Sequence, residues 1–197
     1  MDIAEKLTTC YRKLVGSVPE GIWFAPGRVN LIGEHTDYND GFVLPFALEQ
    51  RALVAAGLRE DARVVMHALD LGETAELSLS ELRPGIGGWQ AYLSGVLWAL
   101  REAGNQIGGI TMVLPSDVPF GAGLSSSAAI ECSVMAAACD LFGLDIAPID
   151  RAKLTQRAEN VYVGAPTGLL DQAASTLCRA EYWLCRERRL CSRRRRL

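Results

Sequence analysis

Apolar residues recur at helical spacing in two long stretches of the chain. They do so in residues 2–15 and again in residues 89–103, and a glycine follows each stretch. Successive apolar positions that lie three or four residues apart define one face of a helix. We therefore expect two amphipathic helices here, with Trp89 and Trp98 packed in the core rather than against a cofactor.

Shorter stretches alternate apolar residues with small or polar ones, which is the pattern of half-buried strands. These stretches are residues 21–26, 42–48, 53–58, 62–68, 77–79 and 110–114. We expect the strands at 53–58 and 62–68 to pair as an antiparallel hairpin joined at residues 59–61. A further helix is expected to start at Pro148.

A glycine-rich loop lies between the expected strand at 110–114 and a long apolar run. We expect the rest of the chain to be organised around this loop. After Pro119 it reads Gly121, Ala122, Gly123, Leu124, Ser125, Ser126 and Ser127. A loop with few Cβ atoms that leads into a helix N-terminus forms an anion pocket, and phosphate is the expected guest. The alternative is a tight turn followed by serine capping residues. The Walker pattern of nucleotide-binding loops is absent.

Residues 27–41 form a second polar concentration between two apolar stretches. Arg28, Glu34, His35 and Asp37 fall within this segment beside glycines. Charges in apolar surroundings are costly unless they are paired or meet a ligand, so such a cluster indicates a site. The alternative is a hairpin turn at residues 39–41 with solvated charges on its rim.

Composition narrows the class of protein. The chain has 197 residues, of which 49% are hydrophobic and 22% charged, values typical of a soluble globular protein. No apolar run is long enough to span a bilayer. The first residues lack the apolar core of a signal peptide, so we expect a cytoplasmic protein with free thiols rather than disulfides.

Three motifs resemble known families. The order of Pro119, Gly123-Leu124 and 126–128 fits PxxxGLxSSA, the phosphate loop of the GHMP kinases. The segment GRVNLIGEHTDYNDG at 27–41 is similar to the sugar-contacting segment of the galactokinases. AEN at 158–160, followed by VGAPTGLLDQ at 163–172, resembles a third galactokinase segment, in which Thr167 and Leu170 replace the usual cysteine and methionine.

The resemblance implies an α+β fold, the GHMP kinase N-terminal lobe of the ribosomal protein S5 domain 2-like type. In that fold a mixed or antiparallel sheet packs with helices. The lobe would cover residues 1–177, with a galactose-binding segment at 18–50 and the phosphate loop at 117–129. The second lobe of the family, which completes the nucleotide and sugar sites, has no counterpart in this sequence.

The resemblance also implies a role for each matched residue. Asp171 would be the catalytic carboxylate beside the C1 hydroxyl of galactose, and Arg28 would stabilise charge on the transferring phosphoryl group. The sugar would be bound by Glu34, His35, Thr36, Asp37, Gly168 and Asp171. The ATP phosphates would be bound by Gly121, Ala122, Gly123, Leu124, Ser125, Ser126 and Ser127. Magnesium would be held by Ser127 and Glu159.

The implied function is ATP-dependent phosphorylation of α-D-galactose to galactose 1-phosphate, with ATP and Mg²⁺ as cofactors. Two alternatives stay open. The first is a kinase for a related sugar such as N-acetylgalactosamine, and the second is a non-catalytic fragment or sugar sensor. We expect small-molecule partners, neither a membrane nor a nucleic acid, and a monomer for a full-length protein.

The last twenty residues, 178–197, differ sharply from the rest of the chain. They carry eight arginines, two glutamates and three cysteines, for a net charge of +6 against −9 in residues 1–177. Arginine with cysteine is what a GC-rich gene yields when it is read out of frame. We therefore expect a disordered, out-of-frame tail on a truncated protein that is poorly soluble and has little kinase activity. The alternative is a nucleic-acid-binding patch.

Overall fold

The computed structural model describes residues 3–33, 36, 41–115 and 125–178. Five strands form one mixed sheet in the order β1-β2-β5-β3-β4. They are β1 (Gly21–Asn30), β2 (Pro45–Arg59), β3 (Arg63–Ala68), β4 (Glu73–Ser78) and β5 (Gly109–Leu114). The helices are α1 (Ile3–Val15), α2 (Gln90–Glu102), α3 (Ser126–Leu141), α4 (Pro148–Arg157), α5 (Leu170–Leu177) and the single turn η2 (Leu79–Glu81). A π-helical segment, η3 (Ala158–Val163), continues directly from α4.

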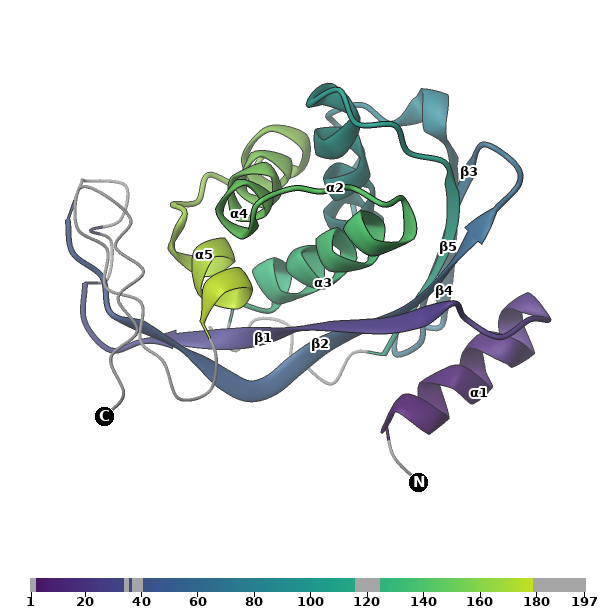
Figure 1. Ribbon diagram of the computed structural model, residues 1–197, viewed down its shortest axis with the longest axis horizontal. Helices are drawn as coiled ribbons and strands as arrows, with labels where there is room; N and C mark the ends of the chain where they lie inside the picture. The colour runs from purple at the N-terminus through teal and green to yellow at the C-terminus, as the bar shows by residue number, and fades with distance from the viewer. Residues whose placement is uncertain (1–2, 34–35, 37–40, 116–124, 179–197) are drawn as a thin grey trace.

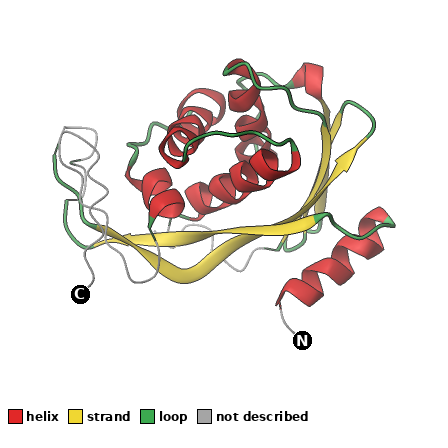
Figure 2. Cartoon of the chain, in the orientation of Figure 1, coloured by secondary structure: helices red, strands yellow, loops and turns green. Residues whose placement is uncertain are grey.

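The helices lie on both faces of the curved sheet, but unequally. In Figure 1, α2, α3, α4 and α5 gather over the concave face, whereas α1 lies alone against the opposite face. Figure 2 shows the same arrangement as a red cluster of helices inside a yellow arc of strands. The predicted α+β class with a mixed sheet is therefore confirmed.

Strand alternation divides the side chains of the sheet between two cores. Val54 and Ala56 of β2 point into the main core with α2 and α3. Ala55, between them, packs with Leu7 and Tyr11 of α1 in a smaller core. Successive side chains of a strand point to opposite faces, so a period of two residues is enough to build both layers. Trp98 is buried in the main core as predicted, while Trp89 is only partly buried against it.

The pairing predicted for residues 53–58 and 62–68 is wrong. The first belongs to β2 and the second to β3, but β5 lies between them, antiparallel to β2 and parallel to β3. Gly109 makes this insertion possible, because a Cβ at that position would lie 1.9 Å from the carbonyl oxygen of Asp61. The stretches 42–48 and 53–58 are also not two strands, since Pro45–Arg59 forms one continuous strand.

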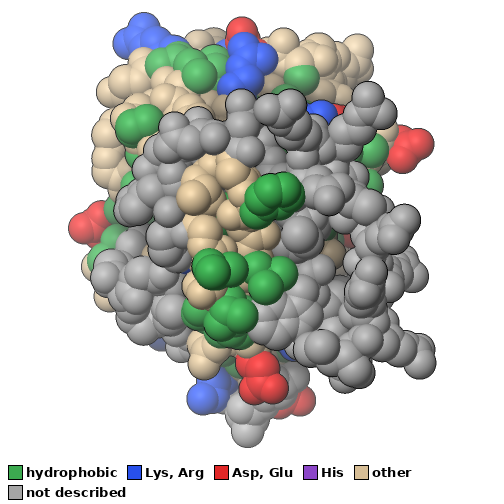
Figure 3. Space-filling view, turned by 90° about the vertical axis from the view of Figure 1, so that its left-hand side faces the viewer, with side chains coloured by type: hydrophobic (Ala, Val, Ile, Leu, Met, Phe, Trp, Pro, Cys, Tyr) green, Lys and Arg blue, Asp and Glu red, His purple; other side chains and the backbone are tan. Residues whose placement is uncertain are grey.

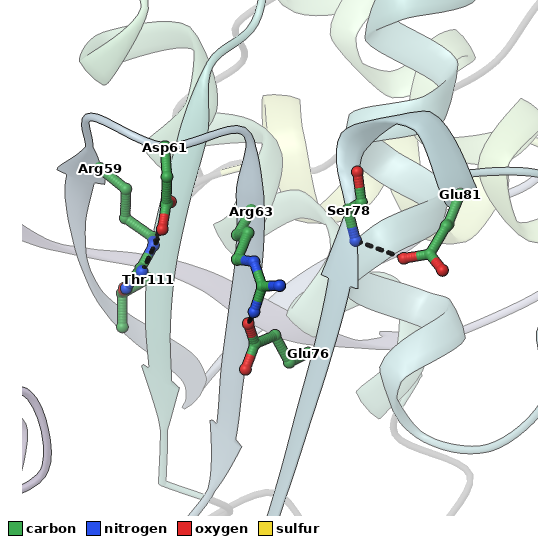
Figure 4. Close-up of polar contacts among 7 residues, drawn as sticks. All are labelled: Arg59, Asp61, Arg63, Glu76, Ser78, Glu81 and Thr111. Atoms are coloured by element: carbon green, nitrogen blue, oxygen red, sulfur yellow. Dashed lines mark hydrogen bonds and ion pairs between the residues drawn. The ribbon is translucent and has the colours of Figure 1, made fainter.

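Polar pairs link neighbouring strands near the turn after β2 and along β3 and β4 (Figure 4). The Arg59 guanidinium donates from Nε to Oδ1 of Asp61 at 2.7 Å and also reaches Thr111 of β5. Arg63 on β3 forms an ion pair with Glu76 on β4. The Arg59 contacts thus link the turn after β2 to β5, and the Arg63 pair links β3 to β4.

Several further expectations concern the whole chain. No helix among the described residues is both long and apolar enough to cross a membrane. Cys10, Cys132 and Cys139 are free thiols, as expected. Cys178, where the arginine-rich tail was expected to begin, is buried in a core cluster with residues of α4 and α5. Residues 179–197 lie outside the described part of the chain, and the tail hypothesis stays a prediction.

Candidate active site

Three residues far apart in the sequence meet at one carboxylate. The Arg28 guanidinium donates from Nε to Oδ1 of Asp171 at 2.7 Å, and its Nη2 lies 2.7 Å from the same oxygen. The Ser125 hydroxyl donates to the other oxygen, Oδ2, at 2.6 Å. The side chains of Arg28 and Asp171 are only 15% and 22% exposed. Both oxygens of Asp171 are therefore held, in a site that is shielded but still open to a ligand.

The local backbone explains why Arg28 and Asp171 meet. The register between β1 and β2 shifts between Pro26 and Arg28, and such bulges re-aim the side chains that follow them. Asp171 lies in the first turn of α5, where a carboxylate is favoured by the helix dipole. The Ser175 hydroxyl of the same helix donates to the Pro26 carbonyl at 2.8 Å and locks α5 onto β1.

Glu159 is the second carboxylate of the site and lies in the π-helical segment η3. It is only 4% exposed. It accepts hydrogen bonds from the side chains of Gln172 and Thr167, and also from Ser127. Burial raises the pKa of Glu159, the Ser127 hydroxyl opposes this, and the nearby negative charge of Asp171 raises the pKa further. A π-helical turn inside a helix is frequently found at functional sites.

The residues fit a magnesium ion. Ser127 and Glu159 bring a hydroxyl and a carboxylate oxygen together, and Asp171 is close enough to act on Glu159 electrostatically. Mg²⁺ prefers oxygen ligands, is usually held by one or two carboxylates and keeps several waters. Within the described residues no group of three His, Cys, Asp or Glu side chains gathers to hold a metal. A bound magnesium would therefore rest on few protein ligands and on the phosphates of a nucleotide.

Only part of the predicted sugar-binding segment belongs to the described residues. Glu34, His35 and Asp37 lie outside them. Thr36 lies within them, and its hydroxyl is within hydrogen-bond distance of the carbonyl oxygens of Gly33 (2.7 Å) and Phe42 (2.8 Å). The Thr36 hydroxyl thus contacts the backbone at the base of this connection, and its predicted contact with the sugar stays a prediction.

The predicted phosphate loop is also described in part. Gly121, Ala122, Gly123 and Leu124 lie outside the described residues. Ser126 and Ser127 open α3, and Ser125 occupies the position before it. The alternative of a capping serine does not hold for Ser125, because its hydroxyl makes no bond to the helix N-terminus. Gly168 is half-buried in the connection that leads to α5.

Two features of the site were missed from the sequence. Glu131 of α3 is fully buried, and within the described part of the chain neither of its carboxylate oxygens meets a donor in good hydrogen-bond geometry, although the nearby Gln172 side chain lowers its pKa somewhat. Burial raises its pKa well above the ordinary value, and the charge of Glu159 adds to this rise. The signal was present in the sequence, because Glu131 is the one charged residue in the apolar run 128–139.

The second missed feature is an apolar cavity beside the end of β5. Trp89 and Tyr92 line it from the start of α2, Leu114 and Pro115 from the end of β5, and Ile130 from α3. Pro115 directly precedes the glycine-rich segment. The apolar spacing of residues 89–103 pointed to the core and could not show that part of this helix faces a cavity.

Two family signatures match the chain. Residues 9–58 match the galactokinase galactose-binding signature, and residues 91–179 match the GHMP kinases N terminal domain. The galactokinase of Streptomyces coelicolor is 53% identical over 186 residues, covering 93% of this chain and 48% of that protein. The galactokinase of Roseiflexus is 44% identical over 180 residues, covering 90% of this chain and 46% of that protein.

Solved structures agree with the sequence matches. Lactococcus lactis galactokinase complexed with galactose superposes with a TM-score of 0.86 at 33% identity, over 93% of this chain and 49% of that one. The mevalonate kinase of Methanococcus jannaschii shares the fold, with a TM-score of 0.73 at 20% identity over 85% of this chain and 53% of that one.

The chain belongs to the GHMP kinase family and carries the N-terminal domain of that family. Within the family, its galactose-binding signature and its curated relatives named above are those of galactokinases. The chain spans about half the length of the curated relatives it matches.

Proposed function

We propose that this chain supplies the catalytic carboxylate, the phosphate-binding loop and the sugar-binding segment of an ATP-dependent kinase acting on the C1 hydroxyl of galactose. The observation that carries the proposal is the meeting of Arg28, Asp171 and Ser125 at one shielded carboxylate. The metal-binding candidates Ser127 and Glu159 adjoin it. The similarity to galactokinases supports galactose as the sugar.

The proposed reaction uses these residues for positioning and charge. Asp171 accepts the proton of the sugar C1 hydroxyl, the sugar oxygen bonds to the γ-phosphorus of ATP, and the bond from that phosphorus to ADP breaks. Arg28, which holds Oδ1 of Asp171, supplies positive charge next to the transferring phosphoryl group. Ser127 and Glu159 would hold magnesium, which neutralises charge on the phosphate oxygens when bound.

The test is an assay of ADP production from ATP with galactose, glucose and N-acetylgalactosamine. The chain is measured alone and joined to the carboxy-terminal half of the Streptomyces coelicolor galactokinase, which this chain does not cover. We expect little turnover from the chain alone and galactose-dependent turnover from the joined protein. Asp171→Asn should reduce turnover at least a thousandfold while galactose binding persists, because the carboxylate is needed mainly in the transition state.

Each other result identifies a different function. A preference for N-acetylgalactosamine would mean a kinase for a related sugar. Sugar binding without any turnover in the joined protein would mean a sugar sensor. Turnover of Asp171→Asn within tenfold of the parent would remove Asp171 from the catalytic role.

A further inference from the structure

Ser125 has a backbone conformation that serine rarely adopts. Its φ and ψ are 52° and 48°, in the left-handed region, and it is the one non-glycine residue with positive φ among the described residues. For a residue with a Cβ, this conformation is less stable than the right-handed one. Glycine would adopt it without this cost. Something in the folded protein must therefore offset the strain at this position.

The usual benefit of a serine at this position is also missing. Serine before a helix normally accepts a hydrogen bond from a backbone N–H in the first turn and so stabilises the helix. Ser125 precedes α3 and makes no such bond. Its hydroxyl instead donates to Oδ2 of Asp171 at 2.6 Å. A hydrogen bond to a charged carboxylate is among the stronger ones. This bond therefore offsets both the strain of the left-handed backbone and the missing capping bond.

The two oxygens of Asp171 have different partners. Nε and Nη2 of Arg28 both lie 2.7 Å from Oδ1, whereas the Ser125 hydroxyl holds Oδ2. The Arg28 contacts hold Oδ1 on one side of the carboxylate. A donor on Oδ2, from a separate element, holds the opposite side and so restricts rotation about the bond to Cβ further.

We propose that Ser125 is a positioning residue for Asp171, and that its left-handed backbone is retained because it aims the hydroxyl at Oδ2. Ser125 directly follows the glycine-rich segment, so this bond ties the phosphate-binding part of the site to the carboxylate that receives the sugar proton. The inference rests on the proposed kinase function, and it adds an orienting role to a serine predicted to contact only phosphate.

Two substitutions separate this role from a structural one, because both remove the hydroxyl but only one removes the strain. Ser125→Ala keeps the strained backbone, and Ser125→Gly relaxes it. The unfolding equilibrium constant of the glycine variant should be about tenfold smaller than that of the alanine variant. In the joined protein both variants should lose kcat to the same extent, about 10- to 100-fold, with KM for galactose and ATP within about twofold of the parent.

A merely structural serine gives a different pattern. Activity would then follow stability, and Ser125→Gly would be clearly more active than Ser125→Ala. That result, or a glycine variant with the kcat of the parent, overturns the proposal. The matched control is Ser133→Ala on the same helix. The Ser133 hydroxyl donates to the Ile130 carbonyl of that helix, so its removal should leave kcat unchanged.

A second measurement needs no kinase activity and uses the 197-residue chain itself. Chemical unfolding of the parent, Ser125→Ala, Asp171→Ala and the double variant gives the coupling between the two side chains. We expect the effect of Ser125→Ala on the unfolding constant to be about tenfold smaller when Asp171 is already alanine, because alanine offers no acceptor to the hydroxyl. Equal effects in both backgrounds would show that the bond is absent. That outcome would overturn the proposal whether or not the proposed kinase reaction is correct.

Discussion

At the scale of single residues, Glu159 is the group most constrained by its surroundings. It is nearly buried and near the negative charge of Asp171, and both effects raise its pKa. The hydroxyls of Ser127 and Thr167 and the amide of Gln172 oppose that rise. A buried carboxylate is stable when donors or a cation surround it. The donors are present, and a divalent cation with nucleotide would complete the set.

The first prediction concerns this pair of oxygen ligands. Ser127→Ala and Glu159→Ala should each raise the magnesium concentration needed for half-maximal ATP binding, by about 10-fold for the hydroxyl and more for the carboxylate, because each removes one ligand. Isothermal titration with ATP at a series of magnesium concentrations measures the shift. Galactose binding without nucleotide serves as the control, and an equal loss there would show that both residues are structural.

The second prediction concerns the pH dependence of stability through Glu131. Burial raises its pKa well above the ordinary value of 4.5, with the charge of Glu159 adding to the effect. A carboxyl group with a raised pKa in the folded state contributes its full stability below pH 4.5 and loses it as the pH rises toward the folded-state pKa. In the parent, the free energy of unfolding should therefore fall by up to about 1.4 kcal/mol per pH unit above pH 4.5. Glu131→Gln, which is neutral and similar in shape, should not show this fall.

Chemical unfolding of the parent and of Glu131→Gln between pH 4.5 and pH 8 measures that difference. Glu102→Gln on the exposed face of α2 is the matched control and should follow the parent. If Glu131→Gln loses stability with pH as steeply as the parent does, Glu131 is not the group responsible.

At the scale of elements, local sequence patterns predicted most of the secondary structure but not the order of the strands in the sheet. Residues 2–15, 89–103 and 110–114 form the elements that their apolar spacing predicts, each within two residues. The strands at 53–58 and 62–68 looked like a hairpin because they are adjacent in sequence. Their separation by β5 depends on a contact between Gly109 and Asp61 that no local pattern contains.

For the site, too, local motifs identified individual residues but not the contacts between them. The motifs pointed to Arg28, Glu159 and Asp171, and the structure brings Arg28 to Asp171, with Asp171 near enough to Glu159 to shift its pKa. The helix α5 that presents Asp171 was not predicted, because eight residues are too few for a clear periodic pattern. The bond between Ser125 and Asp171 joins positions 46 residues apart and could come only from the fold.

The third prediction belongs to the connection between β1 and β2. Gly33 has φ of +99°, and a Cβ there would lie 2.2 Å from the Phe42 carbonyl oxygen. Gly33→Ala should therefore cost about 2–4 kcal/mol of stability and weaken galactose binding, since the connection carries the predicted sugar ligands. Thermal unfolding and galactose titration measure the two effects.

Gly72→Ala provides the control for backbone conformation alone. Gly72 also has positive φ, at +63°, but a Cβ there meets nothing within 4 Å. It should cost only about 1 kcal/mol and leave galactose binding unchanged. Equal costs for the two variants would mean that the close approach at Gly33 is not needed.

At the scale of the whole molecule, apolar side chains are concentrated at one end of the sheet. Leu31, Ile32 and Phe42 lie in the connection between β1 and β2 and are 61%, 69% and 64% exposed. Figure 3 looks onto this end of the molecule and shows hydrophobic side chains gathered there. Burying one large apolar side chain is worth about 1.5–3 kcal/mol, so this patch favours contact with another apolar surface.

The fourth prediction is that this patch makes the 197-residue chain self-associate. Replacing Ile32 and Phe42 together by Asn should shift the onset of association to at least about tenfold higher protein concentration, because two apolar side chains no longer gain from burial. Light scattering coupled to size-exclusion chromatography over a range of concentrations measures the shift.

Leu14→Asn on α1, at 47% exposure and on the opposite face of the sheet, is the matched control. If the control raises the onset as much as the double variant, general surface hydrophobicity rather than this patch drives the association. The joined protein described above should remain monodisperse without either substitution if its added half covers the patch.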